Sequence, residues 1–73
     1  MLKYVRLKED KIIIFPGSIK HAEFSNFNPV TAGACIIDPE KKEVNCFGGS
    51  IALGLRSDER NDTKLATLQL FGE

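Results

Sequence analysis

The chain has no tryptophan, one tyrosine, one histidine and two cysteines among its 73 residues. Two cysteines are too few for the small secreted scaffolds that several disulfides hold together. With a single histidine beside them, the chain also falls short of the four ligands that a structural zinc site needs. We therefore expect neither a disulfide framework nor a metal site, and no cofactor.

Net charge and long apolar runs are missing as well. Ten lysine and arginine residues balance ten aspartate and glutamate residues, so no general attraction to nucleic acid or to an anionic membrane is expected. The longest apolar run covers residues 12–16, far below the roughly 20 residues of a membrane-spanning helix. Residues 1–6 mix charged with apolar side chains, unlike a signal peptide. These features predict a cytoplasmic protein, in the host cytoplasm if it is viral, with no membrane association.

Length and composition predict one small globular domain over residues 1–73. The chain is 42% hydrophobic and 27% charged, which separates it from disordered sequences. A chain of this length buries only about 60% of its surface on folding. Domains of this size commonly gain stability from a disulfide, a metal, a partner subunit or very tight packing. We expect a homo-oligomer.

Four segments have the composition of β-strands. Residues 2–7 alternate loosely between apolar and charged side chains, and residues 11–15 follow after a polar turn. The four bulky residues at positions 12–15 indicate a strand buried on both faces, and the first two strands are expected to pair as a hairpin. Residues 30–37, whose small side chains permit close approach to the backbone, and residues 43–47 predict two further strands.

The turn over residues 38–42 decides how the two cysteines are related. If it is centred on Glu40 and Lys41, Cys35 and Cys46 lie opposite each other on neighbouring strands. A cross-strand disulfide is then geometrically feasible. A reducing cytoplasm instead favours two free thiols that behave as small apolar side chains.

Two further segments are less regular. Ser18 is placed to cap a short helix, or a structured loop, over residues 19–27. Gly48 and Gly49 permit a bulge or bend before a fifth strand over residues 50–55, in which apolar residues alternate.

The last segment predicts a helix over residues 59–70. Leu65, Leu68 and Phe71 form an apolar stripe at helical spacing, and Gly72 is placed as the stop. The predicted class is α+β: a small antiparallel sheet of about four to five strands, with one C-terminal helix and a short helical segment after the second strand.

Catalytic signatures are missing from the sequence. It contains no P-loop, no nucleophile elbow and no pair of histidines at metal-binding spacing, so we predict no catalytic residue and no enzymatic activity. The lone histidine, His21, is interpreted either as a surface or capping residue or as a hydrogen-bonding contact to a ligand. The phenylalanines at positions 15, 24, 27 and 47 are assigned to the core in preference to base stacking.

Two segments are candidates for binding an anion. Gly48 and Gly49, followed by Ser50, either expose backbone N–H groups to an anion or merely bend the strand. Arg56 and Arg60 flank the expected helix start, where a guanidinium can pair with phosphate or carboxylate. Acidic residues at positions 58, 59 and 62 also suit that helix start, so solvated surface charges are the alternative. The predicted ligand-binding residues are His21, Gly48, Gly49, Ser50, Arg56 and Arg60.

Four short runs stand out along the chain: IIIFP at residues 12–16, HAEF at 21–24, VTAG at 30–33 and SIALGL at 50–55. Together they resemble runs in small uncharacterised proteins that occur in bacteriophage and prophage genomes, and the resemblance covers nearly the whole chain. It implies a mobile-element origin, where tiny domains often interfere with host defence. Such domains bind a host protein or sequester a cyclic nucleotide or related signalling molecule.

We therefore expect a non-catalytic, homo-oligomeric binding protein that captures a small anionic ligand, such as a nucleotide second messenger, in a pocket between subunits. One alternative is a protein–protein inhibitor of a host defence enzyme, with residues 2–7 as an exposed edge strand that adds to the partner's sheet. Another is a small structural or assembly component of a phage particle.

Overall fold

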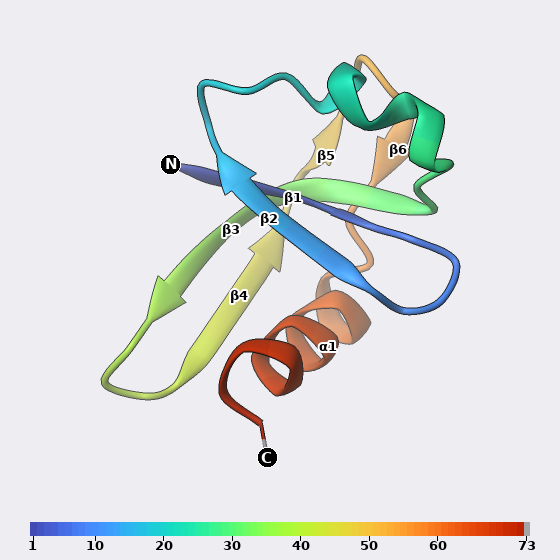
Figure 1. The fold of residues 1–73 in the computed structure, drawn as a ribbon. Helices are drawn as coiled ribbons and strands as arrows, with labels where there is room; N and C mark the ends of the chain where they lie inside the picture. Colours follow the sequence, from blue (N-terminus) through green and yellow to red (C-terminus); the bar gives the residue numbers. More distant parts are fainter. Residues whose placement is uncertain (73) are drawn as a thin grey trace.

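The computed structural model describes residues 1–72 and has an α+β fold, as predicted (Figure 1). A four-stranded sheet carries a short 3₁₀ helix and a two-stranded hairpin on one side and an α-helix on the other. The elements, in chain order, are β1 (Leu2–Arg6), β2 (Ile12–Pro16), the 3₁₀ helix (His21–Phe27), β3 (Thr31–Asp38), β4 (Glu43–Phe47), β5 (Gly49–Ser50), β6 (Leu55–Arg56) and α1 (Glu59–Phe71).

The main sheet is antiparallel throughout, in the order β2-β1-β3-β4. The two predicted hairpins, β1–β2 and β3–β4, are both present. In the second turn the Asp38 carboxylate accepts hydrogen bonds from the backbone N–H groups of Glu40 and Lys41, each at 3.1 Å. This turn places Cys35 opposite Cys46 in the predicted register, and both thiols are free and buried.

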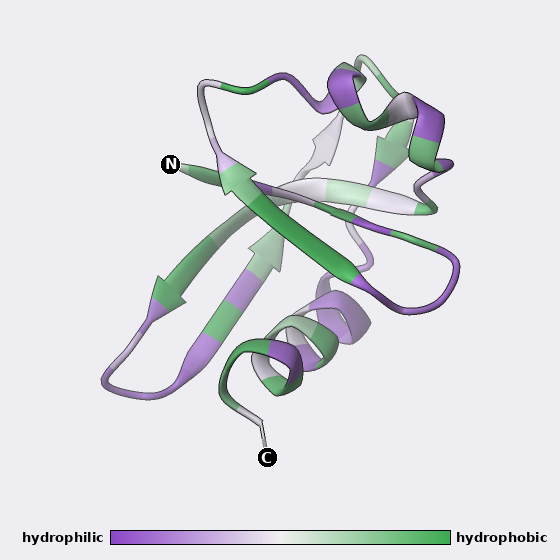
Figure 2. Cartoon of the chain, in the orientation of Figure 1, coloured by the Kyte–Doolittle hydropathy of each residue, from purple (hydrophilic) through white to green (hydrophobic). Residues whose placement is uncertain are grey.

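Alternation along the strands divides the apolar residues into two cores. The first core lies between the sheet and α1 and consists of Tyr4, Ile12, Cys35, Val44, Cys46 and Ala66. The second core lies on the opposite face, where the 3₁₀ helix and the β5–β6 hairpin cover Val5, Phe15 and Ala32. Strand β2 contributes to both, which explains its unbroken apolar sequence and confirms that it is packed on both faces (Figure 2).

Helix α1 covers the outer edges of the sheet with polar side chains. The Gln69 amide accepts a hydrogen bond from Ile12 N at 2.9 Å and donates one to Ile12 O at 2.6 Å, as a neighbouring strand would. At the other edge, the Thr67 hydroxyl accepts a bond from Val44 N at 2.9 Å and donates to Val44 O at 3.2 Å. Edge strands whose backbone groups lack such partners tend to pair with other chains.

This arrangement corrects the expectation that residues 2–7 form an exposed edge. Strand β1 lies in the middle of the sheet between β2 and β3, so it has no free edge to offer a partner. The edge strands are β2 and β4. The edge position of β2 could not be read from its composition, because both its faces are covered although one of its edges is not paired with another strand.

The buried face of α1 also differs from the expected apolar stripe. Leu65 and Phe71 pack against the first core, but Leu68 is 63% exposed, and the buried positions of the helix are Asp62 and Ala66. The helix meets the sheet through these apolar residues and also through hydrogen bonds of its polar side chains. Apolar spacing alone therefore does not mark its inner face.

Two other expectations are corrected in part. The helix after β2 is a 3₁₀ helix that begins at His21, and its N-cap is Lys20, which makes no side-chain capping bond; Ser18 is not the cap. Residues 50–55 do not form one strand: β5 and β6 are joined by a turn in which Gly54 N donates to Ile51 O at 3.1 Å. The turn directs Leu53 and Leu55 toward the second core and leaves Ile51 fully exposed.

Candidate ligand-binding site

The β5–β6 hairpin and the start of α1 surround an open cavity of about 820 Å³, which we call the loop pocket. Cavities that hold small molecules fall in this size range. Its lining residues are Gly48, Gly49, Ser50, Ile51, Gly54, Leu55, Arg56, Ser57 and Glu59.

Four of the six predicted ligand-binding residues line the loop pocket. They are Gly48, Gly49, Ser50 and Arg56, which local sequence alone had placed in two neighbouring segments. Pairing of Gly49 with Arg56 in the β5–β6 hairpin brings the glycines beside the guanidinium-bearing strand. Arg56 is exposed, so its side chain is free to reach a ligand at the pocket mouth.

The other two predicted residues lie outside it. Arg60 lines an adjoining cavity with residues of β4, and Glu59 borders both cavities. His21 lines neither. Its Nε2 lies 2.9 Å from Gly33 O, and its ring meets Phe15 edge-on at 5.5 Å between centroids, so it fastens the 3₁₀ helix to the sheet.

Glycine is required at two points of the loop pocket. Gly48 has a φ of +79° and Gly54 a φ of +65°, a conformation that side chains strongly disfavour. Gly48 O accepts a hydrogen bond from Ser57 N at 2.9 Å, which ties together the two chain segments that enter and leave the hairpin. The hydroxyl of Ser50 accepts a bond from Leu53 N at 3.3 Å and keeps its own hydrogen.

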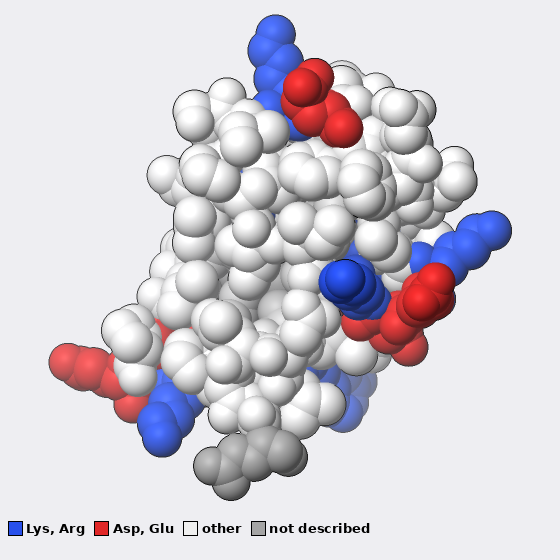
Figure 3. Space-filling model, in the orientation of Figure 1, with Lys and Arg blue, Asp and Glu red and all other residues white. Residues whose placement is uncertain are grey.

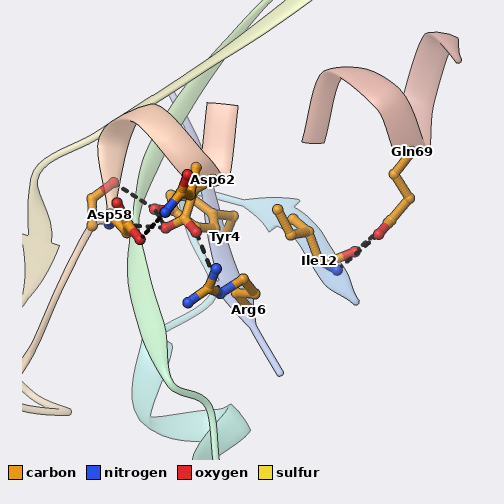
Figure 4. A network of polar contacts seen from close by, with 8 residues as sticks. Tyr4, Arg6, Ile12, Asp58, Asp62 and Gln69 are labelled. Atoms are coloured by element: carbon orange, nitrogen blue, oxygen red, sulfur yellow. Dashed lines mark hydrogen bonds and ion pairs between the residues drawn. The ribbon is translucent and has the colours of Figure 1, made fainter. Parts of the chain in front are cut away.

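A buried polar cluster below the loop pocket was not found by sequence reasoning (Figure 4). Asp62, fully buried in α1, accepts a hydrogen bond from the Tyr4 hydroxyl at 2.5 Å and one from Asp58 N at 3.0 Å. Arg6 Nε lies 3.4 Å from the other Asp62 oxygen, and the Tyr4 hydroxyl also lies 2.5 Å from Ser57 Oγ. The available signal was the lone tyrosine on an inward-facing position of β1, since a buried phenol needs a partner.

Burial sets the protonation of the groups around this cluster. It raises the pKa of the Tyr4 phenol well above its ordinary value, and the hydrogen bond to Asp62 raises it further. Burial also raises the pKa of the Cys46 thiol to about 12 and raises that of Cys35. Both cysteines are therefore protonated and poorly nucleophilic near neutral pH.

Two kinds of feature are absent from residues 1–72. No group of three or more histidine, cysteine, aspartate or glutamate side chains is arranged to hold a metal ion. No helix in the same residues is long and apolar enough to cross a membrane.

Comparison with known proteins gives no match: no family model, no curated protein and no solved structure is significantly similar to the chain.

Proposed function

We propose that the chain is a non-catalytic, homo-oligomeric binding protein of the phage type that captures an anionic small molecule in the loop pocket. A nucleotide second messenger of host defence is the ligand class that best joins the pocket's chemistry with the resemblance to phage proteins. Sequestration lowers the free concentration of such a signal without any chemical step.

The observation that carries this proposal is the convergence of Gly48, Gly49, Ser50 and Arg56 on one cavity. Backbone N–H groups beside glycines allow close approach of an anion. A guanidinium binds phosphate or carboxylate through two parallel hydrogen bonds, which makes arginine well suited to phosphate recognition. Glu59, which also lines the loop pocket, belongs to α1, and its carboxylate would repel an anion, so the anionic group is assigned to the Arg56 strand.

The states of the reactive side chains support a binding role over catalysis. Both thiols are buried and protonated, and His21 is engaged with a backbone carbonyl away from the loop pocket. A nucleophile and a base within hydrogen-bonding reach of each other are what covalent catalysis requires.

Exposed apolar surface supports the oligomer. Ile51, fully exposed, stands at the loop pocket, where a second subunit would bury it and cover the open cavity. On the face in Figure 3, charged side chains lie mainly near the hairpin turns and at the top, and the broad area over β2 carries few of them. We assign the subunit contact to the Ile51 side, because that contact would complete the pocket.

Native mass spectrometry of protein purified directly from its host tests the proposal. An oligomer that carries an extra mass of a few hundred daltons is the expected result, and the mass identifies the ligand. A stable monomer without added mass contradicts the interface pocket. A bare oligomer shifts support to a protein target.

A charge substitution then locates the site. Arg56→Gln is expected to weaken binding of inorganic phosphate or of the co-purified ligand about tenfold, since one charge-assisted hydrogen-bond pair is lost. Lys41→Gln, in the β3–β4 turn, is the matched control and is expected to bind as the unchanged protein does. Equal loss in both variants would indicate nonspecific attraction instead of a site at Arg56. Calorimetry measures both.

Inhibition of a host protein is the second candidate function, and one groove favours it. The groove runs along α1 over Leu65, Leu68 and Phe71 and is flanked by Lys42 and Lys64. This chemistry fits an acidic amphipathic segment of a partner. Leu68→Asp would abolish recovery of a stoichiometric partner in a pull-down if this function holds.

A further inference from the structure

The buried cluster under the loop pocket has a defined hydrogen-bond direction. It begins at Asp62, whose carboxylate is fully buried and faces Arg6 Nε at 3.4 Å and Asp58 N at 3.0 Å. The same Asp62 oxygen that accepts from Asp58 N also accepts the Tyr4 hydroxyl hydrogen, at 2.5 Å. Tyr4 is therefore the donor of this bond.

The direction at Ser57 follows from that of Tyr4. A phenol has one hydrogen, and the hydrogen of Tyr4 is committed to Asp62. Ser57 Oγ lies 2.5 Å from the same phenol oxygen, so Ser57 is the donor of this second bond. The single hydroxyl hydrogen of Ser57 is thereby used inside the protein.

We propose that Ser57 is a specificity-determining residue of the loop pocket, where it presents only a hydrogen-bond acceptor. This inference rests on the proposed function and names the ligand chemistry more closely. Ser57 accepts from a neutral hydroxyl or N–H of the ligand and repels a phosphate or carboxylate oxygen placed at the same point. The preferred ligand then carries a neutral donor next to its anionic group.

Two neighbouring residues of the loop pocket have different hydrogen-bonding character. The exposed Arg56 guanidinium donates, which suits an anion. Ser57, the next residue along the chain, accepts. A ribonucleotide combines both requirements, since its sugar hydroxyls lie close to its phosphate.

Packing holds Ser57 close to Tyr4. A Cβ on Gly33 would lie 3.2 Å from both Ser57 Cβ and Tyr4 Cε1 and would collide with the Phe47 carbonyl oxygen, so only glycine permits this close approach. The backbone of Ser57 is held in turn by its N–H bond to Gly48 O at 2.9 Å. These two contacts fix the position of Ser57 between Tyr4 and the loop pocket.

Titrations followed by NMR spectroscopy test the inference with four probes. These are the monophosphates of adenosine, deoxyadenosine, dideoxyadenosine and inosine. Loss of the donor that Ser57 reads is expected to weaken binding about tenfold, the value of one hydrogen bond with its desolvation cost. Loss with the deoxy sugars identifies a ribose hydroxyl as the donor, and loss with inosine monophosphate identifies the base amino group.

Two variants separate this inference from the proposed function. Ser57→Ala has no acceptor for this hydrogen bond. It is expected to bind all four probes with the weak affinity that the unchanged protein has for the probe without the donor. Tyr4→Phe leaves the Ser57 hydroxyl free to donate, so the preference for probes that carry the donor is expected to shrink. The NMR spectrum of the backbone is expected to remain that of the folded protein. Equal affinity for all four probes in the unchanged protein overturns the role of Ser57 and leaves the anion site in place. Failure of every probe and of inorganic phosphate to bind overturns both proposals.

Discussion

The two faces of the sheet are covered in different ways. On the first face, side chains of α1 accept hydrogen bonds from the backbone N–H groups of both edge strands, at Ile12, Val44 and Cys46. On the second face, none of the residues of the 3₁₀ helix is buried, and the β5–β6 hairpin consists of two-residue strands joined by an exposed turn.

This difference separates a scaffold from the proposed binding surface. Regions with many buried contacts open rarely, whereas short hairpins with exposed tips open locally at low cost in free energy. Binding residues are commonly found on loops that a rigid scaffold holds in place. The loop pocket lies where the two regions meet, at Ser57, which directly precedes the N-cap residue of α1 and also lines the cavity.

The largest expected effect comes from breaking the scaffold at Asp62. Asp62→Ala leaves the Tyr4 hydroxyl and the Arg6 guanidinium buried beside each other without their acceptor, so we expect a loss of about 3 kcal/mol or more in unfolding free energy. Asp62→Asn keeps an acceptor oxygen and is expected to lose less. Glu40→Gln, on the exposed β3–β4 turn, is the control. Urea denaturation measures all three, and equal stability of Asp62→Ala and the control would contradict the cluster's role.

Opening an edge of the sheet is expected to cost less. Gln69→Leu removes both hydrogen bonds to Ile12 and is expected to lower the unfolding free energy by about 1–3 kcal/mol. The exposed backbone of β2 should also make the protein associate at high concentration. Leu70→Ala, at an exposed neighbouring position, is the control. Light scattering and urea denaturation test the prediction, which fails if Gln69→Leu behaves as the control does.

These edge contacts also show where prediction from sequence ends. The hairpins and the Cys35–Cys46 register were predictable because turn residues and β-branched runs are local signals. The contacts of Gln69 and Thr67 with the edge strands were not, since they join segments distant in sequence. The apolar spacing of Leu68 suggested burial, but this side chain is exposed, and the buried residues of α1 are Asp62 and Ala66.

The same distinction holds for the candidate site. Gly48, Gly49, Ser50 and Arg56 were found because they lie close together in sequence around one hairpin. The Tyr4–Asp62 bond spans 58 positions, so no local pattern points to it. The alternation of apolar residues at positions 51, 53 and 55 is compatible with either a strand or a turn. The positive φ of Gly54 belongs to the turn that separates β5 from β6.

Alkaline pH is the next perturbation, and it is expected to lower the free energy of unfolding through the first core. The pKa of Cys46 rises on folding from its ordinary value of 9.0 to about 12, because burial disfavours the thiolate. Its stabilising contribution is complete below about pH 9 and is lost progressively as pH rises toward 12. Tyr4 adds to the loss above its ordinary value of 10.0. Urea denaturation across this range should show a shallower decline in Cys46→Ala, and identical slopes would contradict the assignment.

The smallest effect on monomer stability is expected at Ile51, in the turn of the β5–β6 hairpin. Its side chain is fully exposed, so Ile51→Ser should change the unfolding free energy by less than about 0.5 kcal/mol. If subunits meet over the loop pocket, the same change removes apolar area from the interface, and the oligomer should dissociate at concentrations where the unchanged protein stays assembled. Sedimentation velocity measures this, with Leu70→Ser on α1 as the matched exposed control. Dissociation in Leu70→Ser alone would place the interface on the scaffold side and leave the loop pocket open, which would remove the reason to expect a ligand between subunits.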